Sequence, residues 1–508
     1  MKIKNLVAAC AVAAASFSAT TTMAAAPATP FETPATLIDV YLTGASAPQN
    51  ILGALAATLF GANSGVGVFN NYHVIYDNGV SGAVGASYRA YYGQLQAAHT
   101  IGGVTLPAGT PVRLTDRAKG GSVFGVNPVA RSQTIAWMPI TAGNCVAAPA
   151  GLDHNFRCGE AGNDITFPAT GRISDFGVSD VEPAMFKGPY NVEFGQNELA
   201  PNELNRLQSF ATSGLLFGLP ATVSVPPTIS FNKSVYSSLL SGIITDWTAL
   251  DPTLTGNTQV VVCRRVQGSG TQATYNAHYN NFPCTAGSVA GSGVLPPLRM
   301  ADSAGYSEPT PTTISVDPSA GLTVIENPSS GNVRTCMQRA QIGGNHTFTS
   351  DDGRAVTVNF GAGGYRAIGT LSLDSPSTPD YTHRELAGQL PTKANLRTGQ
   401  YGFYSELSMQ YRGDGYVTFN PATLASSFVS GSPGAGSIDQ RRRAFINLFI
   451  NRAGDPAILN QIASVPLRNA TAALPINFTP GEANLEQQNT MYVTQFGNSC
   501  SPAQRIQP

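Results

Sequence analysis

The most constraining feature of the chain is a strand, a turn of small residues and a helix, placed one after another within residues 36–60. The stretch TLIDVYLTG (36–44) is mostly apolar and predicts a buried strand. After the turn ASAPQ, the stretch NILGALAATLF (50–60) has the apolar face of a helix. This order opens a parallel α/β unit, so we expect an α/β fold. With 508 residues, the chain is long enough for two or three domains.

Beyond residue 60 the sequence alternates between loop- and strand-rich stretches and a few helices. Residues 61–170 and 285–360 are expected to form loops and β structure, and 214–231 is extended and punctuated by proline. The patterns further predict strands over 258–266 and 364–373 and helices within 232–247, 271–282 and 437–462. Asp439 is placed to cap the last helix, and Gly454-Asp455-Pro456 is expected to end it.

The first 26 residues have the organisation of a secretory signal peptide. Lysines precede an apolar core at 6–17, and small residues at 24–26 offer a cleavage site, so we expect a signal peptide over residues 1–26. An alternative is a lipoprotein box ending at Cys10, but almost no apolar core precedes this cysteine. No later stretch is long and apolar enough to span a bilayer. We therefore expect a protein without a membrane span that is periplasmic or secreted.

Charge is sparse and balanced in this chain: 29 Lys and Arg residues face 30 Asp and Glu residues, for a net charge of −1. Such a chain lacks the broad basic field that nucleic-acid binding requires. The run Arg441-Arg442-Arg443 could suggest a nucleic acid or a membrane surface, but basic residues on one helical turn more often form a solvated face. A small anion site remains compatible with a neutral chain.

The chain has seven cysteines, of which Cys10 belongs to the signal peptide and six remain after cleavage: Cys145, Cys158, Cys263, Cys284, Cys336 and Cys500. An even number in an exported chain predicts disulfides, and six cysteines allow 15 pairings. Proximity in the sequence favours Cys145–Cys158 and Cys263–Cys284, which leaves Cys336–Cys500. No Cys-x-x-Cys pair occurs, and the six histidines lack a metal-binding spacing, so no metal site is expected.

The segment RRVQGSGTQATYNAHY combines cations, a glycine turn and a predicted helix. The first N–H groups of that helix lack partners within it, and the helix dipole adds positive charge there. Gly268 and Gly270 permit a close approach to the backbone, whereas Ser269 and Thr271 add hydroxyl donors. The planar guanidinium of Arg265 suits a tetrahedral oxyanion. The segment therefore predicts a cage for phosphate or sulfate.

Two other interpretations of this segment stay open. The first is a capped helix beside a structural arginine, with no ligand. The second is a serine nucleophile at Ser269, but the hydrolase elbow G-x-S-x-G needs glycine where Gln267 and Thr271 stand. The wider sequence weakens the first interpretation.

Several blocks of the sequence resemble, in the same order, the phosphate-binding proteins of bacterial ABC transporters, a branch of the type 2 periplasmic binding proteins. The blocks are TGASAPQ (43–49), GGSVFGV (120–126), DFGVSDVEP (175–183), LPATVSVPPTISFNKSVYSSLLSGIITDW (219–247) and RRVQGSGTQ (264–272). Within them, LLSGIITDW (239–247) is the most specific match. Gln267 departs from the family, which usually has Asp there as the partner of the arginine.

The resemblance implies an α/β fold of two lobes around a cleft, the type 2 periplasmic binding protein fold, enlarged here by inserted loop and β segments. Lobe one would comprise residues 37–218 and 390–500, and lobe two residues 226–385. The chain would cross between the lobes near 218–225 and 398–407. Insertions in surface loops leave such a fold intact. The ligand would lie between the lobes, and closure would be a hinge motion.

The resemblance also implies roles for individual residues. From two turns of lobe one, Ser46, the backbone of Ala47 and Ser122 would donate hydrogen bonds to the ligand. The cage residues would complete the site: Arg265, Ser269, Gly270 and Thr271. Asp180 would accept a hydrogen bond from a protonated ligand oxygen, which suits HPO₄²⁻ and repels fully ionised sulfate. Taken alone, Asp180 could equally cap a helix before VEPAMF.

We therefore expect an extracytoplasmic solute-binding protein, not an enzyme, that captures phosphate or a similar oxyanion and needs no cofactor. An ABC transporter permease is the partner that the family implies. One alternative is a secreted scaffold or surface protein that kept the fold and lost or changed its ligand, which the low charge and the insertions favour. Another is a phosphate-ester hydrolase, which lacks any recognisable metal-ligand or nucleophile motif.

Overall fold

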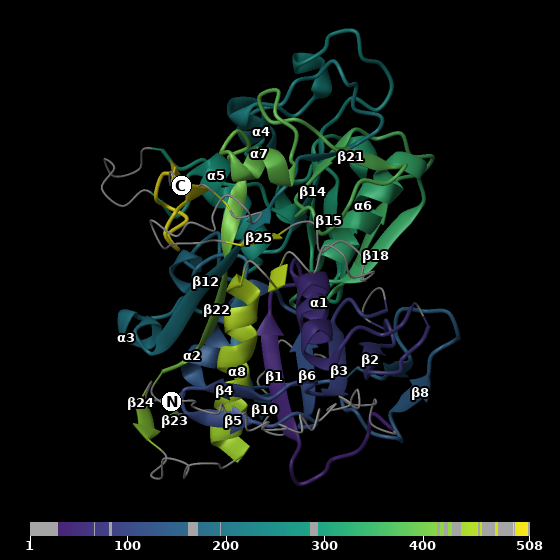
Figure 1. Cartoon of the computed structure of the whole chain (residues 1–508). Coiled ribbons are helices and arrows are strands. Elements are labelled where there is room, and N and C mark those ends of the chain that lie inside the picture. The colour runs from purple at the N-terminus through teal and green to yellow at the C-terminus, as the bar shows by residue number, and fades with distance from the viewer. Residues whose placement is uncertain are drawn as a thin grey trace, which may run out of the picture.

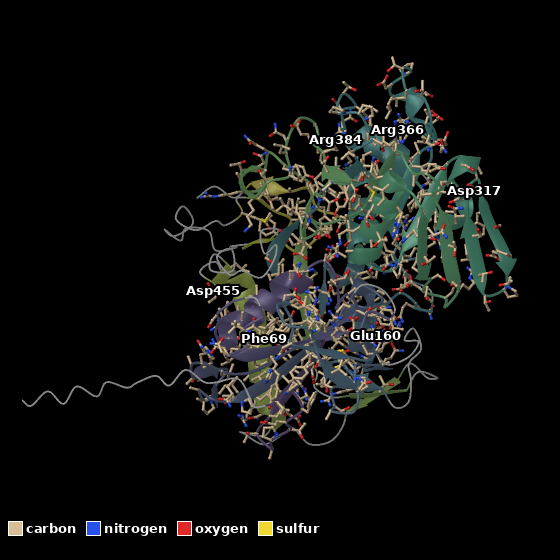
Figure 2. The ribbon with its side chains drawn as sticks, turned by 90° about the vertical axis from the view of Figure 1, so that its right-hand side faces the viewer. Phe69, Glu160, Asp317, Arg366, Arg384 and Asp455 are labelled. Atoms are coloured by element: carbon tan, nitrogen blue, oxygen red, sulfur yellow. A yellow bond between two sulfur atoms is a disulfide. The ribbon has the colours of Figure 1, made fainter. Side chains whose placement is uncertain are left out.

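Two sheets of unequal size organise the chain into two lobes, one below the other in Figure 1. The lower lobe contains Phe69 and Glu160, and the upper lobe contains Asp317, Arg366 and Arg384 (Figure 2). The computed structural model describes residues 29–65, 67–80, 84–160, 171–193, 195–284, 293–413, 417–420, 425–428, 438–455, 458–459, 473–475, 491 and 493–505. The expected signal peptide lies outside the described residues. The expected mixed α/β class, with two lobes and inserted strands, is confirmed.

The larger lobe is built on a ten-stranded sheet with the strand order β25-β12-β22-β11-β1-β6-β3-β2-β9-β8. Its strands are β1 (Ile38–Gly44), β2 (Tyr72–Asp77), β3 (Tyr88–Gln94), β6 (Pro111–Arg117), β8 (Cys145–Ala147), β9 (Phe156–Cys158), β11 (Phe176–Ser179), β12 (Leu207–Leu216), β22 (Tyr404–Arg412) and β25 (Ala473–Pro475). At its centre, β1 pairs in parallel with β6 and β11, as the strand–turn–helix pattern predicts.

Two helices cover one side of this sheet: α1 (Gln49–Phe60) and α8 (Ile438–Gly454) contact each other and β1, β3 and β12 (Figure 1). The first helix matches the predicted range within one residue. The second ends at Gly454, where the Gly-Asp-Pro sequence was expected to end it. Their buried Leu, Ile, Phe and Ala side chains join those of the sheet in one hydrophobic core.

The smaller lobe contains a five-stranded sheet with the order β17-β14-β20-β13-β21. Its strands are β13 (Pro220–Thr222), β14 (Val261–Arg265), β17 (Thr323–Asn327), β20 (Ala367–Gly369) and β21 (Tyr381–His383). β14 is buried along its whole length and pairs in parallel with β17 and β20. The helices of this lobe are α4 (Lys233–Leu240), α5 (Gly270–Asn280) and α6 (Ser330–Ile342), of which α5 and α6 contact β14.

A four-stranded sheet extends the smaller lobe within residues 285–360, the stretch expected to hold loops and strands. Its strands are β15 (Tyr306–Thr310), β16 (Thr313–Val316), β18 (Asn345–Thr349) and β19 (Ala355–Asn359), in the order β15-β16-β19-β18. The strands agree with this expectation, but the helix α6, which also lies in this stretch, was not predicted. Its buried positions follow a helical spacing that the sequence displays: Val333, Cys336, Met337 and Ala340.

Short elements connect the two lobes and their sheets. The further helices are α2 (Asn127–Arg131), α3 (Pro201–Leu204) and α7 (Lys393–Arg397), with 3-10 turns η1 (Ser122–Gly125), η2 (Pro183–Met185), η3 (Trp247–Ala249), η4 (Met300–Asp302) and η5 (Pro318–Ala320). Small strand pairs are β4 (His99–Ile101) with β5 (Val104–Leu106), β7 (Thr134–Ile135) with β10 (Arg172–Ile173), β23 (Val417–Asn420) with β24 (Ala425–Phe428), and β26 (Val493–Thr494) with β27 (Gln504–Arg505).

The chain passes between the two main sheets twice. It leaves the large sheet at the end of β12 and enters the small sheet at β13. It returns from β21 through α7 to β22. The domain limits drawn from the sequence, 37–218 with 390–500 and 226–385, stay a prediction.

Three disulfides join cysteines of the described chain: Cys145–Cys158, Cys263–Cys336 and Cys284–Cys500. The first pairing is confirmed. The pairings Cys263–Cys284 and Cys336–Cys500 are wrong, because the helix α5 separates Cys263 from Cys284. Its 11 residues span about 16 Å, at a rise of about 1.5 Å per residue. The cysteine of β14 pairs instead with that of α6, which packs directly on the strand.

The arginine run on α8 is half-buried rather than solvated. Arg442 lies near Asp175 and Asp439 at 3.7 and 3.1 Å, and Arg443 lies over the ring of Tyr411 at 4.2 Å. The run therefore helps to hold α8 on the large sheet. Among the helices of the described residues, none combines the length and the apolar character needed to cross a membrane.

Candidate functional site

The turn that follows β1 carries the first of the predicted site residues. Ser46 and Ala47 are 8% and 2% exposed in this turn, which is tied to β11 by a hydrogen bond from the Ala45 N–H to the Val178 carbonyl. The Ser46 hydroxyl accepts a hydrogen bond of 3.0 Å from the guanidinium of Arg265. Ser46 belongs to the larger lobe and Arg265 ends β14 of the smaller lobe, so the two lobes meet at this bond.

Arg265 is a buried cation whose hydrogen-bond partners are neutral. Its Nη1 donates to the hydroxyls of Ser46 and Ser330 at 3.0 and 3.2 Å. Its Nε and Nη2 donate to the carbonyls of Asn327 and Pro328 at 3.2 and 2.9 Å. The side chain is 1% exposed, and no carboxylate of the described residues forms a salt bridge with it. Burying a charge without an opposite charge is costly, so this guanidinium suits an anionic partner.

The surroundings of Arg265 explain why it lacks a carboxylate partner. Gln267, which stands where the resembled family has Asp, donates instead to the carbonyl of Pro189 at 2.8 Å. Burial lowers the pKa of Arg265, and the charges of the Asp180, Asp351 and Glu193 carboxyls act against this shift. The guanidinium nevertheless stays charged at neutral pH, because an arginine pKa begins far above it.

The turn before α5 brings backbone and hydroxyl donors to the same place. Gly268 has a φ of +82°, and Ser269 begins the helix as its N-cap, with its hydroxyl accepting from the Gln272 N–H at 3.4 Å. The capped-helix interpretation is therefore correct for the Ser269 oxygen, although its proton remains a donor. A side chain at Gly270 would come within 2.8 Å of the Asp180 Cβ and would also collide with Ser122. Only glycine allows this approach.

Asp180 faces this helix start from the other lobe. Its Oδ2 accepts a hydrogen bond of 2.8 Å from the Thr271 hydroxyl, and its backbone N–H donates to the Ser122 hydroxyl at 3.3 Å. Its Oδ1 is buried and has no hydrogen-bond partner in the part of the chain that the structure describes. The alternative of a helix cap is wrong, because the N-cap position of η2 falls on Glu182, two residues later.

Burial raises the pKa of Asp180 to about 6, while hydrogen bonds from Thr271 and the charge of Arg265 lower it. A carboxyl with this pKa can exist as a proton acceptor or, in mildly acidic solution, as a proton donor. It is therefore suited to a ligand oxygen that carries a proton part of the time.

The structure brings all the predicted site residues to one buried zone where the lobes meet. They come from the turns after β1 and β11, from η1, and from the end of β14 with the start of α5: Ser46, Ala47, Ser122, Asp180, Arg265, Ser269, Gly270 and Thr271. A direct hydrogen bond of 2.9 Å from the Val123 N–H to the Gly268 carbonyl joins two of these turns. The zone combines the Arg265 cation and hydroxyl donors with a buried carboxyl oxygen of Asp180 for which the described residues provide no hydrogen-bond partner.

Sequence reasoning missed Ser330, the first residue of α6. Its hydroxyl lies 3.2 Å from Nη1 of Arg265 and 3.4 Å from the Ser46 hydroxyl. The sequence did contain a signal for this helix: Ser329 is a good N-cap residue, and a helical apolar spacing begins at Val333. In the structure the Ser329 hydroxyl accepts a hydrogen bond from the Asn332 N–H at 3.1 Å and so caps α6. Within the described residues, no group of His, Cys, Asp and Glu side chains is placed to hold a metal ion.

No family model and no curated protein matches this chain. Several solved structures are similar to it. One, from Clostridium perfringens with bound phosphate, is named for a phosphate ABC transporter substrate-binding role. It shares 11% identity with this chain, with a TM-score of 0.39, over 86% of this chain and 100% of the other. An ABC-type phosphate transport receptor from Vibrio cholerae shares 13% identity, with a TM-score of 0.28, over 58% of this chain and 79% of the other. A phosphate binding protein from Stenotrophomonas maltophilia shares 13% identity, with a TM-score of 0.24, over 54% and 76%.

Proposed function

We propose that this protein is an extracytoplasmic solute-binding protein of the type 2 periplasmic class and that it captures phosphate between its two lobes. Two observations carry the proposal: within the described chain the buried guanidinium of Arg265 donates only to neutral groups, and the Oδ1 of Asp180 in the same zone has no hydrogen-bond partner. An anion would compensate the charge of the guanidinium, and a protonated anion oxygen would satisfy the Oδ1. The order of the motifs in the sequence supports the same assignment.

Phosphate fits this site better than sulfate because the site contains both a positively charged guanidinium and a negatively charged carboxylate. The donors of Arg265, Ser46 and Ser330 suit ionised oxygens, whereas the Asp180 carboxylate accepts a hydrogen bond only from an oxygen that has a proton. HPO₄²⁻ has such a proton at neutral pH and sulfate does not. Like charges placed together cost several kcal/mol, so Asp180 would discriminate against sulfate.

Asp180→Asn is expected to narrow the preference for phosphate over sulfate by at least about tenfold at pH 8, since about 1.4 kcal/mol corresponds to a factor of ten. The amide keeps the size of the side chain and removes the negative charge that repels sulfate. Isothermal titration calorimetry with both anions, on the wild type and on the variant, measures the ratio of the Kd values. An unchanged ratio would show that Asp180 does not select the ligand.

The raised pKa of Asp180 predicts how selectivity changes with pH. In the wild type, sulfate should bind more tightly as the pH falls through about 6, because the protonated carboxyl then donates to a sulfate oxygen. Arg265 stays protonated throughout this range, whereas burial raises the pKa of Asp351 to about 6 and that of Glu193 well above its usual value. In Asp180→Asn the sulfate Kd should therefore change less between pH 8 and pH 5 than in the wild type, and the remaining trend would come from these two carboxyls. Titrations at several pH values test this, and a wild-type Kd without a pH trend would contradict it.

Binding and turnover measurements on the purified protein separate the alternative functions. A scaffold that lost its ligand would give no heat with phosphate, arsenate or sulfate. A phosphate-ester hydrolase would turn over a generic phosphate ester, which a binding protein does not. The export by a signal peptide and the ABC transporter permease as a partner belong to the proposal, and the three disulfides are typical of an oxidising compartment.

A further inference from the structure

A polar cavity is lined by residues of both lobes. It has a volume of about 410 Å³, which is within the range of small-molecule pockets. Asn50 of α1 and Arg89 of β3 line it from the larger lobe. Arg334 of α6 and Asp374, which follows β20, line it from the smaller lobe.

Two of the helices that line the cavity, α1 and α6, also lie next to the serine hydroxyls that contact Arg265. Asn50 is the second residue of α1, and the turn with Ser46 leads directly into that helix. Arg334 lies four residues after Ser330 on α6. Residues four apart face the same side of a helix, about 6 Å apart along its axis. A ligand with its phosphate at Arg265 would therefore reach this cavity with the next few atoms.

Asp374 presents one paired and one unpaired carboxyl oxygen at the cavity. It is 8% exposed, and its Oδ2 accepts a hydrogen bond of 3.0 Å from the amide of Asn50. Asn50 in turn accepts at 2.8 Å from the guanidinium of Arg89, so the carboxyl is held in place across the lobes. Its Oδ1 is buried, and none of the described residues forms a hydrogen bond with it. Burial raises the pKa of Asp374 to about 7, so near neutral pH it can accept or donate a hydrogen bond.

The charges of the lining indicate an uncharged, hydroxylated occupant. Arg89 and Arg334 disfavour a cation, and Asp153 and Asp374 disfavour a second anion. An alkyl chain would leave the buried Oδ1 of Asp374 without a partner, which is costly. Hydroxyl groups, in contrast, donate to carboxylates and accept from guanidinium and amide groups. The ring of Tyr76, which stacks on His154 at 4.5 Å, adds an aromatic wall.

We propose that the site also accepts phosphate monoesters of small polyols, with the phosphoryl group at Arg265 and the hydroxylated part in the cavity at Asp374. This inference rests on the proposed phosphate site and extends it to a class of organic ligand. No covalent step is involved, because the ester binds and is released intact.

The test compares inorganic phosphate, sn-glycerol 3-phosphate and ethyl phosphate by calorimetry on the full mature protein. The wild type is expected to bind glycerol 3-phosphate at least about tenfold more tightly than ethyl phosphate, the size of one hydrogen bond to a charged group. Asp374→Ala should bring the two esters to within about threefold of each other, a difference below one such bond, while the Kd for inorganic phosphate changes far less. Arg334→Ala, at an exposed position, provides a second variant with the same expected direction.

Three results would contradict the inference in distinguishable ways. Tight phosphate binding together with absent or equal binding of both esters would exclude the polyol cavity and leave the phosphate site intact. Absence of binding for inorganic phosphate itself would exclude the proposed function and this extension with it. Equal losses for phosphate and glycerol 3-phosphate in Asp374→Ala would show that Asp374 supports the structure and does not contact the polyol.

Discussion

Replacing Arg265 with methionine is expected to raise the Kd for phosphate by at least about a hundredfold, because each hydrogen bond involving a charged group contributes about 1.5–3 kcal/mol and an arginine can make two to one oxyanion. The guanidinium is buried where the lobes meet, beside the hydroxyls of Ser46 and Ser330. Methionine has a similar length and no charge. Isothermal titration calorimetry of the two proteins, side by side, measures the loss.

The same substitution is expected to change the stability of the phosphate-free protein much less than it changes phosphate binding. Methionine removes the desolvation cost of the buried charge, which offsets the loss of the hydrogen bonds that Arg265 donates to four neutral oxygens. Thermal unfolding in phosphate-free buffer gives the Tm of both proteins. If Arg265 had a structural role and did not bind phosphate, the main effect of the substitution would be a large fall in Tm.

Arg366→Met is the matched control for Arg265→Met. Arg366 lies in the same lobe, away from the larger lobe (Figure 2), and donates to the carbonyls of Thr255 and Asn257 at 3.2 and 2.8 Å. Its loss should change the Kd for phosphate by less than about twofold, within the scatter of substitutions outside a site. If Arg265→Met binds phosphate as tightly as Arg366→Met, the proposed site is wrong.

The parts of the site that sequence reasoning could predict are those in which local chemistry decides the structure. The strand–turn–helix at residues 36–60 follows from apolar periodicity, and the turn before α5 follows from its glycines and its serine cap. The structure of these short segments is set mainly by interactions between residues close together in the sequence. Their convergence on Arg265 was expected from a resemblance, and the structure shows the contacts that bring them together.

The helix α6 was missed because its first turn favours other conformations. It begins with Ser330, Gly331 and Asn332, residues of low helix propensity, in a stretch otherwise rich in strands. Tertiary packing decides the outcome here: Cys336 and Met337 are fully buried, and the helix contacts β13, β14 and β20. The site residue Ser330 was missed together with its helix.

The wrong disulfide pairings have a different cause. Proximity in the sequence is a useful guide when the intervening residues form a hairpin, as they do between Cys145 and Cys158 on the neighbouring strands β8 and β9. Between Cys263 and Cys284, in contrast, a helix carries the chain away from β14. The partner of Cys263 lies 73 residues away, and no short-range pattern indicates it.

Removing the Cys263–Cys336 disulfide by Cys263→Ala together with Cys336→Ala is expected to lower the free energy of unfolding by about 4 kcal/mol, the loop-closure estimate for a loop of 73 residues. The disulfide also joins β14, which ends at Arg265, to α6, which begins at Ser330. Its loss frees α6 to shift relative to the guanidinium, so the Kd for phosphate should rise as well. Urea unfolding and calorimetry on the same preparation measure the two effects.

The disulfide Cys145–Cys158 offers a control that separates stability from binding. It closes a loop of 13 residues between β8 and β9, at the edge of the large sheet, and its removal should cost about 3 kcal/mol by the same estimate. Neither strand contributes to the proposed phosphate site, so Cys145→Ala with Cys158→Ala should lower stability and leave the Kd for phosphate unchanged. If both double variants weakened phosphate binding equally, general loosening of the protein would explain the loss. A loss confined to the Cys263–Cys336 variant would instead show that the relative position of α6 and β14 sets the affinity.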